Sequence, residues 1–208
     1  MGTSTFAGPV RSEGGFKVIS KDADTGAITD QFVIDSSGVQ TQTSNTLATE
    51  AGAGITGGTG TVYESSVERV GGMIRTTILI DLTGLSSTAT GGDIIGTGTA
   101  AAHLGQITTA RNGTIFAGQV TCWEVPTTGD DDIDLYSAVE DTGAYDDAIS
   151  GLDETALLAA GGAWTLGSAN AKPLTALPAA DEYLYLTTGA TTAGEYDAGK
   201  LMIELWGY

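Results

Sequence analysis

The chain has 208 residues, of which 41% are hydrophobic, and this length suits one large β domain or one domain plus an extended arm. Its 26 Asp and Glu residues against 8 Lys and Arg residues give a formal net charge of −18, which would repel phosphate backbones and anionic membrane surfaces. We therefore expect neither nucleic acid nor a membrane as a partner. The one cysteine, Cys122, excludes an internal disulfide, and its apolar neighbours predict a small buried residue.

Residues 1–60 differ from the rest and predict an N-terminal arm. Met1–Gly15 is rich in Gly, Ser and Thr, and we expect it to be extended. Residues 16–20 and 27–35 are strand candidates separated by the turn-forming sequence KDADTG, which predicts one β-hairpin. An isolated hairpin is marginal in water, so it needs the main body, a sister subunit or another protein as a partner. Residues 36–60 predict a polar linker in which nothing packs.

The segment Met73–Leu85 has the clearest pattern in the chain and predicts the strand around which the body is built. Its apolar and β-branched residues recur with a period of two, which is typical of a half-buried strand. The residues expected on the buried side are Ile74, Thr76, Ile78, Ile80 and Leu82.

The body is expected to extend from residue 61 to residue 208, with several further strands. Residues 114–125 are apolar on both faces, with Trp123 expected on one face and Phe116 on the other. This strand is therefore central, or one of its faces meets a neighbour, and Pro126 is expected to end it. The other strand candidates are residues 61–70, 133–139, 163–166, 181–187 and 200–206.

One helix is expected, over residues 150–160, because acidic residues occupy its first turn and Gly161 and Gly162 follow it. The many strands, joined by both short turns and long crossings, predict an all-β fold. We expect a jelly-roll-like β-sandwich with an extended N-terminal arm carrying a β-hairpin.

No motif in the sequence predicts catalysis. A catalytic Ser-His-Asp or Cys-His arrangement would have to use His103, the only histidine, and no nucleophile elbow is present. One His and one Cys cannot supply the ligands of a zinc site. No Gly-rich loop joins a strand to a helix as a dinucleotide site requires. We therefore expect a structural or surface role for His103, no cofactor and no enzymatic activity.

The acidic run near residue 132 is a weak calcium candidate. Asp130, Asp132 and Asp134 have the spacing of the first ligands of a calcium loop, but the sixth position holds Leu135 where such a loop requires Gly. A solvated acidic face is the favoured interpretation.

Three aromatic residues, Tyr183, Tyr185 and Trp206, could form a platform for stacking sugars. Because they lie at strand spacing, a place in the core or in a subunit interface is favoured. Carboxylates for glycoside hydrolysis are plentiful, but the sequence singles out no pair.

Residues Thr3–Phe16, TSTFAGPVRSEGGF, resemble the start of small virion proteins of tailed bacteriophages from marine bacteria. The stretches GGMIRTTILIDLTGL, GDIIGTGTAAAHLGQIT, GDDDIDLYSA, TALPAADEYLYLTTG and the terminal ELWGY resemble the same group. The resemblance covers most of the chain and implies a capsid decoration, or cement, protein. Such proteins often have jelly-roll bodies, form homotrimers and bind the outer head surface over junctions of the major capsid protein.

On this resemblance we expect a protein made in the host cytoplasm and located on the outer capsid surface of the virion. Residues 1–60 would grip the capsid lattice, and Phe6, Pro9, Val10 and Phe16 are the expected anchors. These four could instead dock on the protein's own body. Residues 61–208 would form the jelly-roll that trimerises. The alternative is a head or tail fibre, or a receptor-binding module that binds carbohydrate, and a weaker one is a glycoside hydrolase or lyase.

Overall fold

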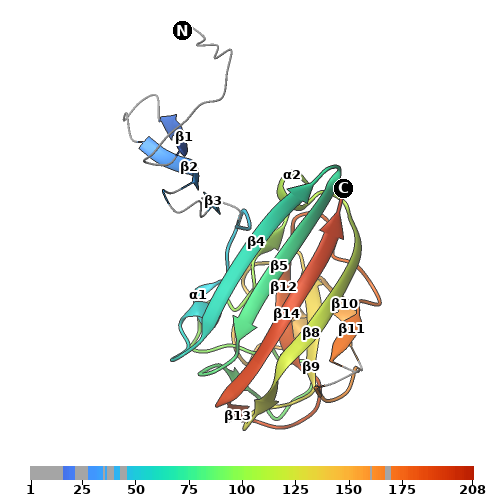
Figure 1. Ribbon diagram of the computed structural model, residues 1–208. Coiled ribbons are helices and arrows are strands. Elements are labelled where there is room, and N and C mark those ends of the chain that lie inside the picture. The colour runs from blue at the N-terminus through green and yellow to red at the C-terminus, as the bar shows by residue number, and fades with distance from the viewer. Residues whose placement is uncertain are drawn as a thin grey trace, which may run out of the picture. The chain divides into compact units, whose positions relative to one another are not determined.

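Residues 16–21, 28–34, 36, 40–42, 46–159, 161–166 and 170–208 are described by a computed structural model of the chain. The chain divides into two compact units, residues 1–45 and residues 46–208 (Figure 1). The two units are described separately below.

The first unit holds a three-stranded antiparallel sheet in the order β1-β2-β3. The strands are β1 (Phe16–Lys21), β2 (Ile28–Ile34) and β3 (Gln40–Gln42). The first two pair along their whole length, which confirms the antiparallel pair expected from the sequence. The sequence does not predict β3, because its Gln-Thr-Gln has no apolar alternation.

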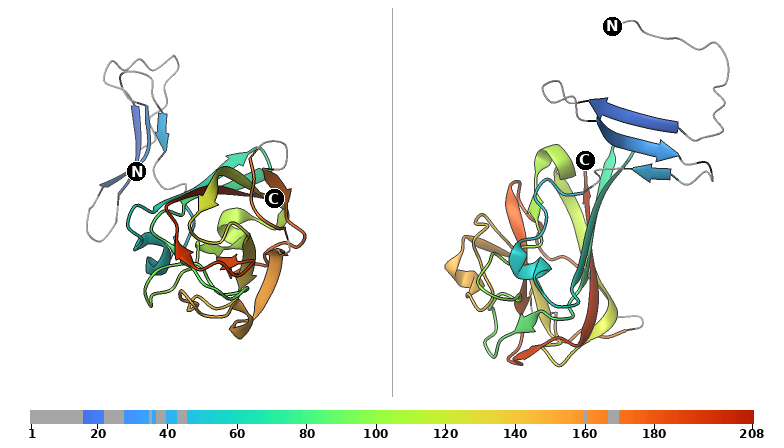
Figure 2. Two further views of the ribbon diagram at one scale, coloured as in Figure 1. Left: turned by 90° about the horizontal axis from the view of Figure 1, so that it is seen from below. Right: turned by 90° about the vertical axis from the view of Figure 1, so that its left-hand side faces the viewer.

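The second unit is an antiparallel β-sandwich, and its two layers are seen from the side in Figure 2. The five-stranded sheet has the order β11-β8-β14-β5-β4, and the four-stranded sheet has the order β10-β9-β12-β7. This confirms the all-β sandwich, while the jelly-roll connectivity stays a prediction. The first sheet comprises β4 (Val62–Val70), β5 (Met73–Asp81), β8 (Ile115–Thr127), β11 (Ala171–Pro173) and β14 (Ala198–Gly207). The second comprises β7 (Gln106–Ile107), β9 (Ile133–Ala138), β10 (Glu154–Leu158) and β12 (Glu182–Thr188).

Short elements complete the second unit. They are the pair β6 (Ser86–Ser87) and β13 (Gly194–Glu195), the helices α1 (Ala53–Thr56) and α2 (Thr109–Asn112), and the 3-10 turn η1 (Ile149–Gly151). Within the described ranges, no helix has the length and apolar character needed to cross a bilayer.

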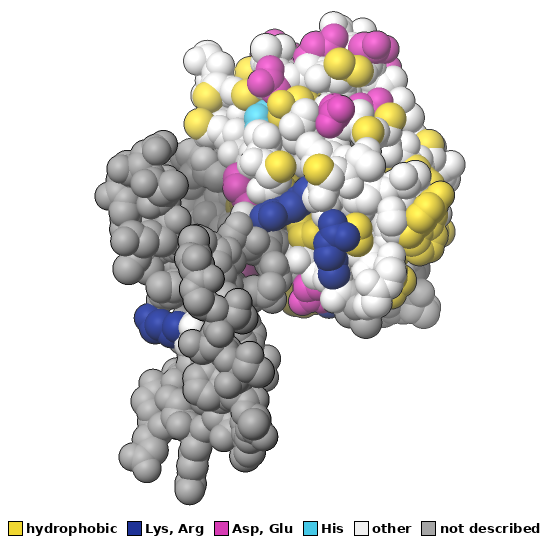
Figure 3. All heavy atoms as spheres, turned by 90° about the horizontal axis from the view of Figure 1, so that it is seen from above, with side chains coloured by type: hydrophobic (Ala, Val, Ile, Leu, Met, Phe, Trp, Pro, Cys, Tyr) yellow, Lys and Arg dark blue, Asp and Glu magenta, His cyan; other side chains and the backbone are white. Residues whose placement is uncertain are grey.

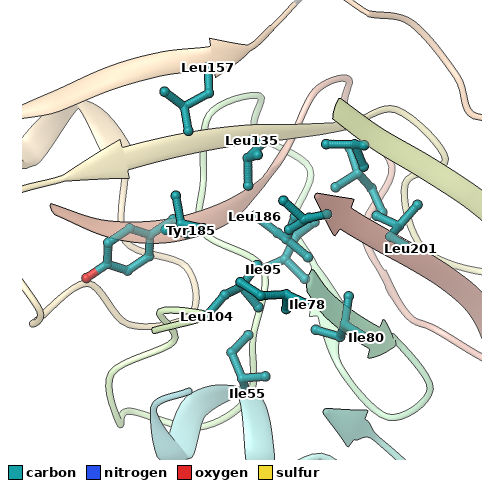
Figure 4. Packing of buried hydrophobic residues seen from close by; sticks show 14 of the residues in the cluster. Ile55, Ile78, Ile80, Ile95, Leu104, Leu135, Leu157, Tyr185, Leu186 and Leu201 are labelled. Carbon is teal, nitrogen blue, oxygen red and sulfur yellow. The ribbon is translucent and has the colours of Figure 1, made fainter. Parts of the chain in front are cut away.

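The core lies between the two sheets. In β5 the buried residues alternate with half-buried or exposed ones from Ile74 to Ile80, as the sequence predicts. Ile78 and Ile80 point towards Leu186 of β12, and Leu135 of β9 lies beside it (Figure 4). Each such side chain contributes about 1.5–3 kcal/mol when it leaves water.

The body begins at residue 46 rather than at residue 61, because residues 46–60 pack on it. Leu47 and Ile55 are buried in the same core as the strands. The amide N–H of Gly54 donates to the carbonyl of Ala101 at 2.7 Å. A Cβ at Gly54 would lie 2.4 Å from the carbonyl oxygen of Ala100, so only glycine permits this approach. The expectation of a linker in which nothing packs is therefore wrong for this segment.

The helix expected over residues 150–160 is also wrong. Only η1 is helical there, and β10 follows it as an edge strand that pairs with β9. The exposed edge of β9 has backbone groups to satisfy, and this tertiary pairing outweighs local helix propensity. Leu157 and Leu158 are both buried as a result.

Two smaller expectations also fail. Residues 163–166 form no strand; the buried Trp164 instead donates its indole N–H to the carbonyl of Ile133 at 2.9 Å. Pro126 does not end β8, which continues to Thr127. The pairing of β8 with β14 is irregular at this point, so the missing N–H of Pro126 is tolerated.

Candidate functional site

The four-stranded sheet is buried on both of its faces. Consecutive residues of a strand point to opposite faces, yet Leu184, Tyr185 and Leu186 of β12 are all at most 1% exposed. The Tyr185 hydroxyl donates to the carbonyl of Glu140 at 2.7 Å, and a Cβ at Gly143 would touch its ring. Residues 140–152 thus cover the face of this sheet that points away from the core.

The five-stranded sheet is buried on one face only. We call its second face the outer face, and no other part of the described second unit covers it (Figures 1 and 2). Its outward-pointing residues are exposed or half-buried, with Thr121 as the exception. The register of the strands assigns to it Val62, Glu64, Ser66 and Glu68 of β4, Met73, Arg75, Thr77, Leu79 and Asp81 of β5, Phe116, Ala117, Gln119, Thr121, Trp123 and Glu124 of β8, and Lys200, Met202, Glu204 and Trp206 of β14.

Two bulges in β8 turn large aromatic side chains onto the outer face. In the pairing of β14 with β8, Lys200 lies opposite Glu124 and Leu201 lies opposite Cys122, so Trp123 has no partner. In the same way, Phe116 has no partner between the pairs that Trp206 and Gly207 form. A bulge leaves its extra residue without a pairing partner and redirects the side chain. Trp123 is consequently 56% exposed and Phe116 is 50% exposed.

The two aromatic residues mark opposite ends of the outer face. At one end, the rings of Phe116 and Tyr208 lie 6.1 Å apart, with the exposed Met73 at the same end of the sheet. We call this the Phe116 end. At the other end, Trp123 borders a pocket of about 230 Å³. The pocket is lined by Val62, Glu64, Leu79, Ile80, Asp81, Trp123, Lys200 and Leu201.

Both cations of the outer face are paired with carboxylates of the same face. Lys200 binds the carboxylates of Asp81, at 3.4 Å, and of Glu124. Arg75 binds Glu68 at 2.8 Å. Although burial raises the pKa of Asp81, hydrogen bonds from Thr83 and the nearby ammonium of Lys200 outweigh it and hold that pKa below its usual value. Asp81 is therefore an anion throughout the neutral range.

The expected capsid anchors fall almost wholly outside the described residues. Phe6, Pro9 and Val10 lie outside them, and Phe16 is the first residue of β1.

Within the acidic run near residue 132, Asp130 binds backbone groups of the surrounding loops. Asp130 is fully buried, and its carboxylate accepts the backbone N–H groups of Asp132, Ala190 and Thr192 at 3.0, 3.1 and 3.3 Å. Asp134 lies in β9 and is also buried, so the solvated face is wrong for these two residues. Among the described residues, no group of three or more His, Cys, Asp or Glu side chains is arranged to hold a metal ion.

His103 is a packed residue. It is 7% exposed, and its ring lies 4.9 Å from that of Tyr183 and 6.3 Å from that of Tyr185. Burial lowers the pKa of His103, and the nearby Asp141 offsets this in part. Cys122 is buried in the core, as the sequence predicts, and burial raises the pKa of its thiol.

The structure does not bring the three aromatic residues of the expected sugar platform together. Tyr185 is fully buried, and Tyr183 packs on His103 in the four-stranded sheet. Trp206 lies on the outer face of the other sheet. The exposed aromatics of that face, Phe116 and Trp123, are not singled out by the sequence. The available signal is the apolar character of both faces of residues 114–125.

No family model matches the chain, and no curated protein or solved structure is detectably similar to it.

Proposed function

We propose that this chain is a non-enzymatic structural protein of a virion, a capsid decoration or cement protein. It binds the outer head surface and bridges subunits of the major capsid protein. The observation that carries the proposal is the three-stranded sheet of the first unit, whose outer strands β1 and β3 are edge strands that can pair with a strand of another protein. The capsid as the setting is the expectation drawn from the sequence stretches quoted above, beginning with residues 3–16.

The distribution of charge supports a location on the outside of the particle. With a net charge of −18, the chain is repelled by packaged DNA. Figure 3 shows most of the acidic side chains of that view gathered at one part of the body, with hydrophobic side chains both among them and in a separate cluster. An acidic surface of this kind suits a protein that faces solvent on the outside of the particle.

The first unit supplies a way to grip a lattice. In the order β1-β2-β3 the outer strands are edge strands, and an edge strand can pair with a strand of another protein. The main-chain hydrogen bonds give affinity, and the anchors Phe6, Pro9, Val10 and Phe16 would add apolar contact. Bridging then acts mechanically, because the contacts oppose separation of the capsid subunits under pressure from the genome.

Two measurements test this function. Immunogold electron microscopy of the source virions, with an antibody to residues 46–208, should label the heads evenly. Co-sedimentation with heads stripped of the protein should then recover the full chain but not a chain that begins at residue 46. Label confined to tail fibres, or equal binding by both chains, would contradict the proposal.

A receptor-binding module is the second candidate, and one observation favours it. The exposed ring of Trp123 borders a pocket that also presents Glu64, Asp81 and Lys200. An aromatic face beside polar groups is the usual arrangement for stacking a sugar. Glycan binding that is lost in a Trp123→Ala variant, together with tail labelling, would favour this function over the first.

A further inference from the structure

We propose that a second copy of this chain packs on the outer face, with Phe116 of each copy seated against Trp123 of the other. The inference rests on the outer face alone and holds whether or not the protein binds a capsid. It names an occupant for the one sheet surface in the second unit that the described chain leaves uncovered.

Most charges of the outer face already have a partner within the chain. A charge that enters an interface alone is strongly destabilising, whereas a charge that is already paired costs less to bury. Lys200 is bound to Asp81 and Glu124, and Arg75 is bound to Glu68. In the middle of the face, the Gln119 amide donates to the Glu204 carboxylate at 2.8 Å.

The positions of the two aromatic residues suit a two-fold pair. Phe116 and Trp123 lie on the same strand, β8, seven positions apart. Because both are the extra residues of bulges, they lie six positions apart along β14, which at ~3.3 Å per residue is roughly 20 Å along the sheet. A two-fold axis that lies in the interface and crosses the strands at right angles exchanges the two ends of the face. It therefore places Phe116 of each copy over the Trp123 pocket of the other, and two contacts form at once.

The charges of the outer face oppose the pairing. The pocket end carries the carboxylates Glu64, Asp81 and Glu124 against the single cation Lys200. The Phe116 end contributes Arg75 together with its partner Glu68, so the two-fold axis brings no free cation over those carboxylates. The apolar contacts must therefore outweigh a residual repulsion, which salt screens.

The pocket itself fits an aromatic side chain better than a sugar. Its walls are mostly apolar, from Val62, Leu79 and Trp123, and two of its polar groups, Asp81 and Lys200, already bind each other. A hydrophobic anchor in a pocket is the common centre of a protein interface.

The area of the outer face is sufficient for a specific dimer. The nine residues of β5 span roughly 30 Å, and four strands at ~4.8 Å spacing span about 19 Å. The face therefore offers on the order of 600 Å² per copy. Two such faces bury about 1,200 Å², which is the lower end of the range for specific protein interfaces.

Sedimentation velocity on the full chain, over a range of concentrations, tests the pairing. The expected result is a reversible dimer that strengthens with added salt, because salt screens the repulsion between two acidic chains. Trp123→Glu and Phe116→Lys should each weaken the dimer by roughly 30-fold or more. Val139→Glu is the matched control, because Val139 is 55% exposed and lies outside the outer face, and it should leave the dimer intact.

Mixing the two variants distinguishes a specific dimer from non-specific association. In a mixed pair, the Trp123→Glu site of one copy faces the Phe116→Lys site of the other, and the second contact is unchanged. We expect the mixture to dimerise more tightly than either variant alone. A chain that stays monomeric at all concentrations, or an oligomer that both variants leave intact, would overturn the inference. So would a monomer whose binding to heads is lost in the same variants, since the capsid would then be the occupant.

Discussion

The two sheets of the body differ in what covers them, although both contribute to one core. The four-stranded sheet is covered on its second face by its own chain, through residues 140–152, and Tyr185 is fully buried there. The five-stranded sheet leaves Leu79, Met202 and Trp206 half-buried and Trp123 exposed on its second face. A chain that covers one sheet on both sides and leaves the other open has a surface to offer to another protein.

The largest expected effect is a difference in stability between variants on the covered second face of the four-stranded sheet and variants on the outer face of the five-stranded sheet. Tyr185→Ala should lower the free energy of unfolding by about 3–5 kcal/mol, because it leaves a cavity and removes a hydrogen bond. Met202→Ala, on the outer face, should cost less than about 1 kcal/mol in dilute protein. Urea denaturation of both variants, followed by fluorescence, measures the difference. Similar losses for the two variants would mean that the outer face is already covered in the single chain.

The covering segments should be as important to stability as the strands. Ile55 is fully buried although it precedes the first strand of the body. Ile55→Ala should therefore cost about 2–4 kcal/mol. The matched control is Val62→Ala, since Val62 is 52% exposed on the outer face and its truncation should have little effect. Urea denaturation again provides the measurement, and an Ile55→Ala variant as stable as the parent would show that residues 46–60 do not pack on the body.

Asp130 should contribute more to stability than its acidic neighbours. Asp130→Ala leaves three backbone N–H groups without an acceptor, which should cost about 1–3 kcal/mol. Asp131→Ala removes the same charge from an exposed neighbour and should change little. Thermal unfolding at neutral pH compares the two. If calcium raised the stability of the parent but not of the Asp130→Ala variant, Asp130 would be a metal ligand instead.

The smallest expected effect is the dependence of stability on pH that His103 contributes. Because burial lowers the pKa of His103, the folded chain binds fewer protons than the unfolded chain below about pH 6.5. Stability should therefore fall as the pH drops from about 7 towards 5, by at most ~1.4 kcal/mol per pH unit for this one group. A His103→Gln variant should show a flatter profile over the same range. Identical profiles would show that His103 is free to be protonated in the folded chain.

Strand periodicity predicted the sandwich well. Apolar residues alternate with polar ones in β5 and β14, and this pattern fits only a strand with one buried face. It failed where tertiary contacts outweigh local preference. Residues 154–158 look helical but pair with the open edge of β9. Residues 46–60 look like a linker, yet Gly54 allows the backbone to approach residues 100–101 closely enough to bury Ile55.

The candidate site could be predicted only in outline. The apolar character of both faces of residues 114–125 indicates a strand whose second face meets a neighbour. Simple alternation, however, places Trp123 and Phe116 on opposite faces. The two bulges of β8 bring both onto the outer face, and bulges depend on the pairing of β8 with β14, which no local pattern contains.

Hydroxyl-radical footprinting with mass spectrometry tests the central claim most directly, namely that the outer face is open in the single chain and covered in the assembled protein. Oxidation of Trp123 and Phe116 would be compared in dilute monomer, in concentrated protein and on virions, with the buried Trp164 and the exposed Val139 as internal references. We expect strong oxidation of Trp123 in the monomer and protection in the two assembled states, while the references do not change. Equal oxidation of Trp123 in all three states would contradict it.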